Sequence, residues 1–367
     1  MQEYWLWKRG ALLGYMAQYP GSVVFYLLLV VVCCLLARAA EELDRPLPLI
    51  AAVVLLVAMS ALRAPSVGID TNSYAIAYNG VVPSYFEPGF VWFIHLLKPL
   101  NSLKIYFGSI ALVVYGFTFA RFWQLRRYCS LTLAVAVYML VFFPSTWNGL
   151  RSCIVTAVMF YSLGFIEKQR YASFLMAVGL CCSIHYSSIA FSLLILASPW
   201  WTQGLTRNRK TALTLVLSLV VAFVVVAFFW MMSSGLFTRY GDEYGNKASM
   251  SRIGLSWYLY FALMLACWHM LKSEERGTEE RARTKTYLLY AILGTGLFIS
   301  GFVWFGGGRL SSYFNIYSTL VLARFWAISR SYRYGMFYRF GAMTYCCYAF
   351  FQVLMSNGQG LLPYVLG

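Results

Sequence analysis

Three arginines stand where a long hydrophobic run meets glycine, asparagine or proline. Arg63 precedes a proline and a glycine, Arg151 follows an Asn-Gly-Leu run, and Arg309 follows three glycines. A guanidinium at a membrane boundary costs free energy unless it finds a partner, although a single one commonly reaches lipid phosphates and fixes the depth of its helix. Three arginines at boundaries that are far apart in the sequence instead favour one shared anionic ligand. Because the planar fork of donors matches phosphate oxygens, we predict that they bind a diphosphate group.

Two carboxylates and one histidine are the candidates for moving a proton near these arginines. Asp70 and Glu87 lie close to hydrophobic runs, and His185 interrupts a run beside Ser183 and Ser187. A carboxylate among arginines either organises a salt bridge or serves as a general base, and both roles stay open for Asp70 and Glu87. An interface role and a proton-transfer role stay open for His185. Asp70 is the first candidate for the base.

The cysteines and glycines carry no pattern typical of a metal or nucleotide site. None of the nine cysteines stands in a Cys-x-x-Cys or Cys/His spacing. The three glycines before Arg309 follow a hydrophobic run rather than a strand. We therefore expect no metal, no cofactor and no disulfide framework.

Membrane-spanning helices must position these residues. The chain is 60% hydrophobic and 11% charged over 367 residues. Its hydrophobic runs are long enough to cross roughly 30 Å of hydrocarbon at about 20 residues each, without the alternation of barrel strands. We predict an all-α polytopic membrane protein, a bundle of about twelve transmembrane helices in one domain over residues 1–367. The expected spans are 22–37, 47–62, 104–123, 131–147, 150–166, 171–184, 187–200, 211–232, 254–271, 286–305, 310–328 and 337–355.

The distribution of basic residues predicts which side of the membrane the candidate residues face. Most of the 29 lysines and arginines fall in alternate connections, beginning with the one after 22–37, which are therefore predicted to be cytoplasmic. Arg63, Arg151 and Arg309 then lie on the outer side, against the usual bias. The net charge of +16 follows from this topology and requires no nucleic acid.

Two segments on the outer side are predicted to be loops. Residues 64–103 are too short and too polar for a confident span, and the apolar stretch inside them predicts a short re-entrant or interfacial helix that lines or covers a cavity. Residues 233–253 form the largest loop. Its aromatic and charged residues, Arg239 among them, suit sugar contact or plain exposure to solvent.

At these residues the chain resembles the EpsG-type family of bacterial polysaccharide polymerases, the Wzy-type enzymes that join lipid-linked repeat units of O-antigen, capsule or exopolysaccharide. The similar pieces, in chain order, are Arg63 with Gly68-Ile69-Asp70-Thr71 and Tyr74, Glu87-Pro88-Gly89-Phe90, Asn148-Gly149-Leu150-Arg151, His185-Tyr186-Ser187, Arg309 with Tyr313-Phe314, and Leu362-Pro363-Tyr364. Many relatives have glutamine directly after the arginine of the Asn148–Arg151 piece, whereas this chain has Ser152.

The resemblance implies a glycosyltransferase of the bacterial inner membrane, with a fold similar to the GT-C class and a site facing the periplasm. Because fixed arginines can stabilise a developing anion, we predict that the enzyme is metal-independent. Its substrates would be glycans linked to undecaprenyl diphosphate. Membrane lipids, a chain-length regulator and other polysaccharide assembly proteins are its implied partners.

The resemblance also assigns roles to the candidate residues. Arg63, Arg151 and Arg309 would stabilise the negative charge that develops on the leaving diphosphate. Asp70, Glu87 or His185 would accept the proton of the attacking sugar hydroxyl. The predicted sugar contacts are Tyr74, Asn148, Tyr313 and Arg239.

Two other functions fit parts of the pattern. A flippase or transporter of the same lipid-linked oligosaccharide also needs basic residues in a helical cavity, but its path should open to both faces, and matched halves would support it. A membrane acyltransferase acting on periplasmic sugars needs a catalytic histidine and an acyl-donor route from the cytoplasm.

Overall fold

The computed structural model describes residues 15–80, 82–191, 260, 263–267, 278–300, 305–329 and 334–367, which are helical apart from turns and one isolated β-bridge between Arg63 and Leu366. The predicted loop 233–253 with Arg239 and the predicted span 211–232 lie outside these residues, as do most of the spans 187–200 and 254–271.

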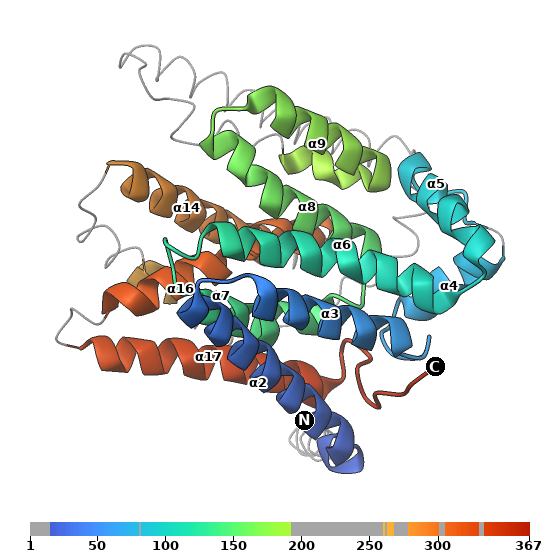
Figure 1. The fold of residues 1–367 in the computed structure, drawn as a ribbon, viewed down its shortest axis with the longest axis horizontal. Helices are drawn as coiled ribbons and strands as arrows, with labels where there is room; N and C mark the ends of the chain where they lie inside the picture. Colours follow the sequence, from blue (N-terminus) through green and yellow to red (C-terminus); the bar gives the residue numbers. More distant parts are fainter. Residues whose placement is uncertain are drawn as a thin grey trace.

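Long apolar helices form the body of the described part (Figure 1). α2, α3, α6, α8 and α9 pack each against the next in that order. Three of them, α2, α6 and α8, are long and apolar enough to cross a membrane. The predicted spans 47–62 and 171–184 coincide with α3 and α9. The bounds are Pro20–Leu43 for α2, Leu47–Leu62 for α3, Leu103–Gln124 for α6, Leu150–Glu167 for α8 and Tyr171–Ile184 for α9.

The later part of the chain contains α14 (Thr278–Ser300), α15 (Phe305–Asn315), α16 (Ser318–Ile328) and α17 (Gly335–Ser356). The prediction of one span over 310–328 is wrong, because α15 and α16 are separate helices. Asn315 ends α15 and packs so closely on α14 that a Cβ at Gly294 would lie 2.3 Å from its Oδ1. Asparagine is a weak helix former, and here it marks the break.

The predicted span 131–147 is also less regular than expected. It begins as α7 (Leu131–Val137), continues as a π-helical turn, η2 (Tyr138–Phe142), and ends as the 3₁₀ turn η3 (Phe143–Ser145). Pro144, inside η3, provides no N–H for a helical hydrogen bond. The chain therefore leaves helical geometry just before Asn148 and Arg151.

Residues 64–103 contain two short helices where the sequence predicted one. α5 (Pro88–Leu97) is the expected helix, begins with a proline at its first position, and is followed by the turn η1 (Lys98–Leu100). α4 (Thr71–Asn79) precedes it. Both lie at one end of the bundle, where the last residues of the chain also lie (Figure 1).

Candidate active site

The ends of three helices meet around the carboxylate of Glu87. Glu87 precedes α5, Arg151 is the second residue of α8, and His185 directly follows α9. Glu87 Oε2 accepts a hydrogen bond from Nη1 of Arg151, and its Oε1 lies 2.7 Å from Nδ1 of His185. The backbone N–H of Tyr186 donates to the same Oε1 at 3.2 Å. One carboxylate thus holds a guanidinium and an imidazole together.

The close packing of α5 on the end of α9 makes this arrangement possible. A Cβ at Gly89 would lie 2.2 Å from Oγ of Ser183 and 2.7 Å from its carbonyl oxygen. Any side chain at this position would push α5 away from α9. Glycine two residues after Glu87 therefore lets the carboxylate reach His185.

The carboxylate of Glu87 is ionised in spite of its burial. Glu87 is only 3% exposed. Burial raises the pKa of Glu87, but the hydrogen bond with His185 and the charge of Arg151 outweigh it and hold the pKa below its usual value. The site therefore combines a negative carboxylate, a positive guanidinium and a histidine.

Aromatic rings surround the guanidinium of Arg151. Its Cζ lies 4.4 Å from the ring centre of Phe86 and 6.0 Å from that of Tyr85. Tyr74 of α4 lies close enough to Arg151 to interact with it, and its ring packs on Phe86 at 5.7 Å between ring centres. The structure thus brings the predicted sugar contact Tyr74 to Arg151, with its ring buried.

Tyr313 approaches the same site from α15. Its hydroxyl lies 2.6 Å from Oγ of Ser187, two residues after His185, and its ring packs on Phe191 at 4.8 Å. Arg309 is in the same helix, one turn before Tyr313, and its side chain lies outside the described part of the structure.

Asp70 lies beside the start of α8, and in the described part of the chain it hydrogen-bonds with neither Glu87 nor His185. Its Oδ2 accepts a hydrogen bond from the backbone N–H of Gly149 at 2.8 Å, and its own N–H donates to Oδ1 of Asn148 at 3.1 Å. The carboxylate therefore stabilises the beginning of the helix that carries Arg151.

Asn148, a predicted sugar contact, has both ends of its amide occupied by protein groups. Besides accepting from Asp70, it donates through Nδ2 to the carbonyl oxygen of Gln359 at 2.9 Å and to Oε1 of Gln359 at 2.7 Å. Gln359 is a residue that sequence reasoning missed. Its only signal was its position three residues before the family-like Leu362-Pro363-Tyr364 piece.

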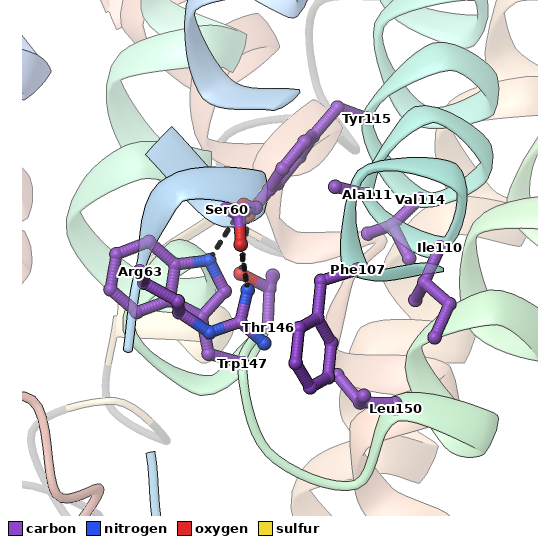
Figure 2. A pocket seen from close by; sticks show the side chains of 10 residues that line it. All are labelled: Ser60, Arg63, Phe107, Ile110, Ala111, Val114, Tyr115, Thr146, Trp147 and Leu150. Carbon is purple, nitrogen blue, oxygen red and sulfur yellow. Dashed lines mark hydrogen bonds between the residues drawn. The ribbon is translucent and has the colours of Figure 1, made fainter. Parts of the chain in front are cut away.

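Arg63 faces a pocket of its own (Figure 2). Its guanidinium lies between the rings of Phe107 and Trp147, with Cζ 4.7 Å and 5.1 Å from their centres. Nη1 donates to the carbonyl oxygen of Ser60 at 2.7 Å. Arg63 and Arg151 are both buried and contact different side chains. Because the side chain of Arg309 lies outside the described part of the structure, the diphosphate set of three arginines stays a prediction.

The start of α8 favours negative charge at this position. The backbone dipoles of a helix leave partial positive charge at its first turn, where anions bind well. Arg151 adds a full positive charge there. A phosphate group beside Arg151 would be attracted both by the dipole of α8 and by the charge of the guanidinium.

No group of three potential metal-ligating side chains lies together within the described residues. Among the described residues, the carboxylate, guanidinium and imidazole groups of this region are those of Glu87, Arg151 and His185, with Asp70 beside them.

Comparison with known proteins matches residues 47–366 to the EpsG family. The matched range includes every element of the site described above. No curated protein and no solved structure gives a significant match to the chain.

Proposed function

Because the chain belongs to the EpsG family, which is linked to exopolysaccharide synthesis, we propose that it polymerises lipid-linked oligosaccharide repeat units. The growing glycan is transferred from its undecaprenyl diphosphate carrier to a sugar hydroxyl of the incoming unit. The reaction takes place at the periplasmic face of the bacterial inner membrane, in agreement with the positive-inside bias of the sequence.

One observation carries this proposal: a single buried carboxylate, Glu87, holds both Arg151 and His185. Arginine is suited to a diphosphate, because several of its donors are directed in one plane. The imidazole has a second nitrogen, Nε2, which is available to a hydroxyl when Nδ1 donates to Glu87. Anion binding and proton transfer therefore come within reach of one substrate.

In the proposed step the acceptor hydroxyl oxygen attacks the anomeric carbon of the donor sugar. The bond between that carbon and the phosphate oxygen breaks, and its electron pair leaves with the diphosphate. Nε2 of His185 takes the hydroxyl proton, while Arg151 stabilises the charge on the departing oxygen. Glu87 orients the imidazole and stabilises its protonated form, as the ionised aspartate of a Ser-His-Asp triad does.

The contacts of Asp70 and His185 support a different order of the candidate bases. Asp70, the first candidate from the sequence, already accepts the N–H of Gly149. His185 has the better position, because its partner Glu87 also holds Arg151. We therefore propose His185 as the base, Glu87 as its orienting group and Asp70 as a group that fixes α8.

Arg309 remains in the proposal as a second diphosphate ligand. It precedes Tyr313 by one turn of α15, and residues four apart share a helix face. Tyr313 contacts Ser187 beside His185. Arg63 is left out of the diphosphate site, because its guanidinium is enclosed by Phe107 and Trp147.

The test is a reconstitution of the purified protein in liposomes with lipid-diphosphate repeat units and no nucleotide. A chelator is included in one arm, because arginines supply the positive charge in the proposed step. We expect a ladder of longer glycans with and without chelator. Product ladders that require a nucleotide sugar would contradict the proposal.

Arg151→Lys tests the arginine itself. Lysine keeps the positive charge but loses the planar fork, so we expect the rate to fall by about 10²-fold. Arg38→Ala is the matched control, because Arg38 only forms an exposed pair with Glu42. Movement of single units across the membrane with no ladder would support the flippase instead.

A further inference from the structure

The residues that follow α17 fold back along the loop before α4. The backbone N–H of Ala64 donates to the carbonyl of Val365 at 2.8 Å, and that of Gly68 donates to the carbonyl of Gly360 at 2.8 Å. The β-bridge between Arg63 and Leu366 belongs to the same pairing. We call residues 357–367 the tail. It lies beside the loop that leads to Asp70.

The tail is fixed at both its turn and its middle. The Asn357 side chain accepts from the N–H of Leu362 at 2.9 Å and donates to the carbonyl of Leu362 at 2.8 Å, which closes the turn. Leu361 and Leu362 are buried. The hydroxyl of Tyr26, in α2, donates to the carbonyl of Leu361 at 2.9 Å. Gln359 is therefore held in place by the surrounding protein.

A chain of hydrogen bonds leads from Gln359 to the start of α8. Nδ2 of Asn148 donates to both oxygens of Gln359, at 2.7 and 2.9 Å. Oδ1 of Asn148 then accepts the N–H of Asp70 at 3.1 Å. Oδ2 of Asp70 accepts the N–H of Gly149 at 2.8 Å, two residues before Arg151. All four residues of this chain of hydrogen bonds are partly buried.

The loop and the start of α8 are packed too closely to shift independently. Gly68 has a φ of +97°, and a Cβ there would lie 2.5 Å from Oγ1 of Thr71 and 3.0 Å from the carbonyl of Trp147. Thr71 donates to that same carbonyl at 3.1 Å. A change in how the tail holds Asn148 is therefore expected to reach Arg151.

We propose that Gln359 is a positioning residue, which sets the start of α8, and with it Arg151, through Asn148 and Asp70. This inference rests on the proposed function for its effect on catalysis, and on the hydrogen bonds alone for its effect on α8. Gln359 touches no substrate in this scheme. It acts by providing the two oxygens that accept hydrogen bonds from Nδ2 of Asn148.

The experiment compares Gln359→Ala and Gln359→Glu in the full chain, reconstituted in liposomes. Gln359→Ala removes one of the two acceptors of Asn148, and we expect kcat for the glycan ladder to fall about tenfold with KM changed less than twofold. Gln359→Glu keeps a side-chain oxygen that accepts from Asn148, so we expect near wild-type kcat. Gln352→Ala, at an exposed glutamine of α17, is the matched control.

Hydrogen–deuterium exchange of the peptide that covers residues 147–152 provides a second readout that needs no substrate. We expect faster exchange in Gln359→Ala, and wild-type exchange in Gln359→Glu and Gln352→Ala. This readout separates the two proposals: if wild-type protein makes no ladder, the proposed function fails, while exchange still decides whether Gln359 fixes α8.

Three results would overturn the inference. The first is wild-type exchange in Gln359→Ala. The second is faster exchange with unchanged kcat, which would leave Gln359 a purely structural role. The third is an equal loss in Gln359→Glu and Gln359→Ala, which would show that the acceptor oxygen is not what matters.

Discussion

The two ends of α8 each carry a buried ionic cluster, and the clusters are built differently. At the start, Arg151 pairs with Glu87, which also holds His185. At the end, Glu167 accepts hydrogen bonds from Arg121 of α6 and Tyr287 of α14. The first cluster takes its partners from the ends of the shorter helices α5 and α9. The second takes Arg121 from the last turn of the long helix α6 and Tyr287 from the interior of α14.

Both clusters place a charge where the helix dipole disfavours it. A positive side chain at the start of a helix and a negative one at its end each oppose the backbone dipoles. Arg151 and Glu167 therefore each need a partner of opposite charge. The end cluster is closed off from solvent, with Arg121 only 2% exposed, whereas the start cluster includes a histidine and a helix start where an anion is favoured. We therefore propose that the end cluster stabilises the fold and that the start cluster performs the chemistry.

The largest expected effect is on the rate, at the start cluster. His185→Gln keeps a donor for Glu87 but removes the proton acceptor, so we expect polymerisation to slow by about 10²–10⁴-fold while the thermal unfolding midpoint stays unchanged. The measurement is the initial rate of ladder formation per folded molecule. Tyr287→Phe, in the end cluster, is the control and should keep the wild-type rate. A fast His185→Gln enzyme would remove His185 from the chemistry.

The next largest effect is on stability, at the end cluster. Arg121→Ala removes the guanidinium that donates to the buried carboxylate of Glu167 and leaves only the longer ionic contact with Arg283, at 3.9 Å, so we expect the free energy of unfolding to fall by about 3 kcal/mol. Chemical denaturation in detergent micelles measures the change. If Arg121→Ala were as stable as the wild type, the end cluster could not have the structural role given to it here.

A smaller effect concerns pH and Glu87. The pKa of Glu87 is held below its usual value of 4.5 by His185 and Arg151, against the effect of burial. Its ionised form therefore stabilises the fold fully above pH 4.5, and this stabilisation is lost as the pH falls through the lower folded-state pKa. We expect Glu87→Gln to remove this part of the acid sensitivity in a titration of the unfolding midpoint. An acid limb identical to that of the wild type would show that Glu87 is not held ionised.

The smallest effect is expected at the surface of α2. Arg38 and Glu42 form an ion pair whose side chains are 67% and 62% exposed. Exposed pairs of this kind contribute little, because solvent screens them. Arg38→Ala should leave both the polymerisation rate and the unfolding midpoint as they are. A clear loss of rate or a clear fall of the midpoint would mean that an exposed ion pair matters as much as a buried one, and burial would then not explain the importance of the two clusters.

Hydrophobic periodicity was sufficient to predict much of the helical framework. The spans 47–62 and 171–184 match α3 and α9, and the short helix after Glu87 is α5. The prediction of one helix over 310–328 was wrong, because hydropathy does not register the break after Asn315, a residue that packs against Gly294 of α14. Local pattern predicts where a helix can form, while neighbouring helices decide where it ends.

The candidate site was predicted as a set of residues but not as a set of contacts. Arg151, Glu87 and His185 were each identified from their residue type and from the glycine, asparagine, proline or serine residues beside them. The resemblance to the EpsG family is confirmed. Their pairing joins residues 64 and 98 positions apart, which a single sequence does not reveal. The separate pocket of Arg63 and the link from Asn148 to Gln359 also depend on tertiary packing, and sequence reasoning missed both.

The most direct test of the central claim is the pH dependence of the polymerisation rate in wild-type protein and His185→Gln, measured with purified lipid-diphosphate repeat units. The account predicts that the wild-type rate rises with pH as one group loses its proton, and that the residual rate of His185→Gln lacks this rise. An identical pH dependence in the two proteins would contradict the claim that the cluster of Glu87, Arg151 and His185 performs the chemistry.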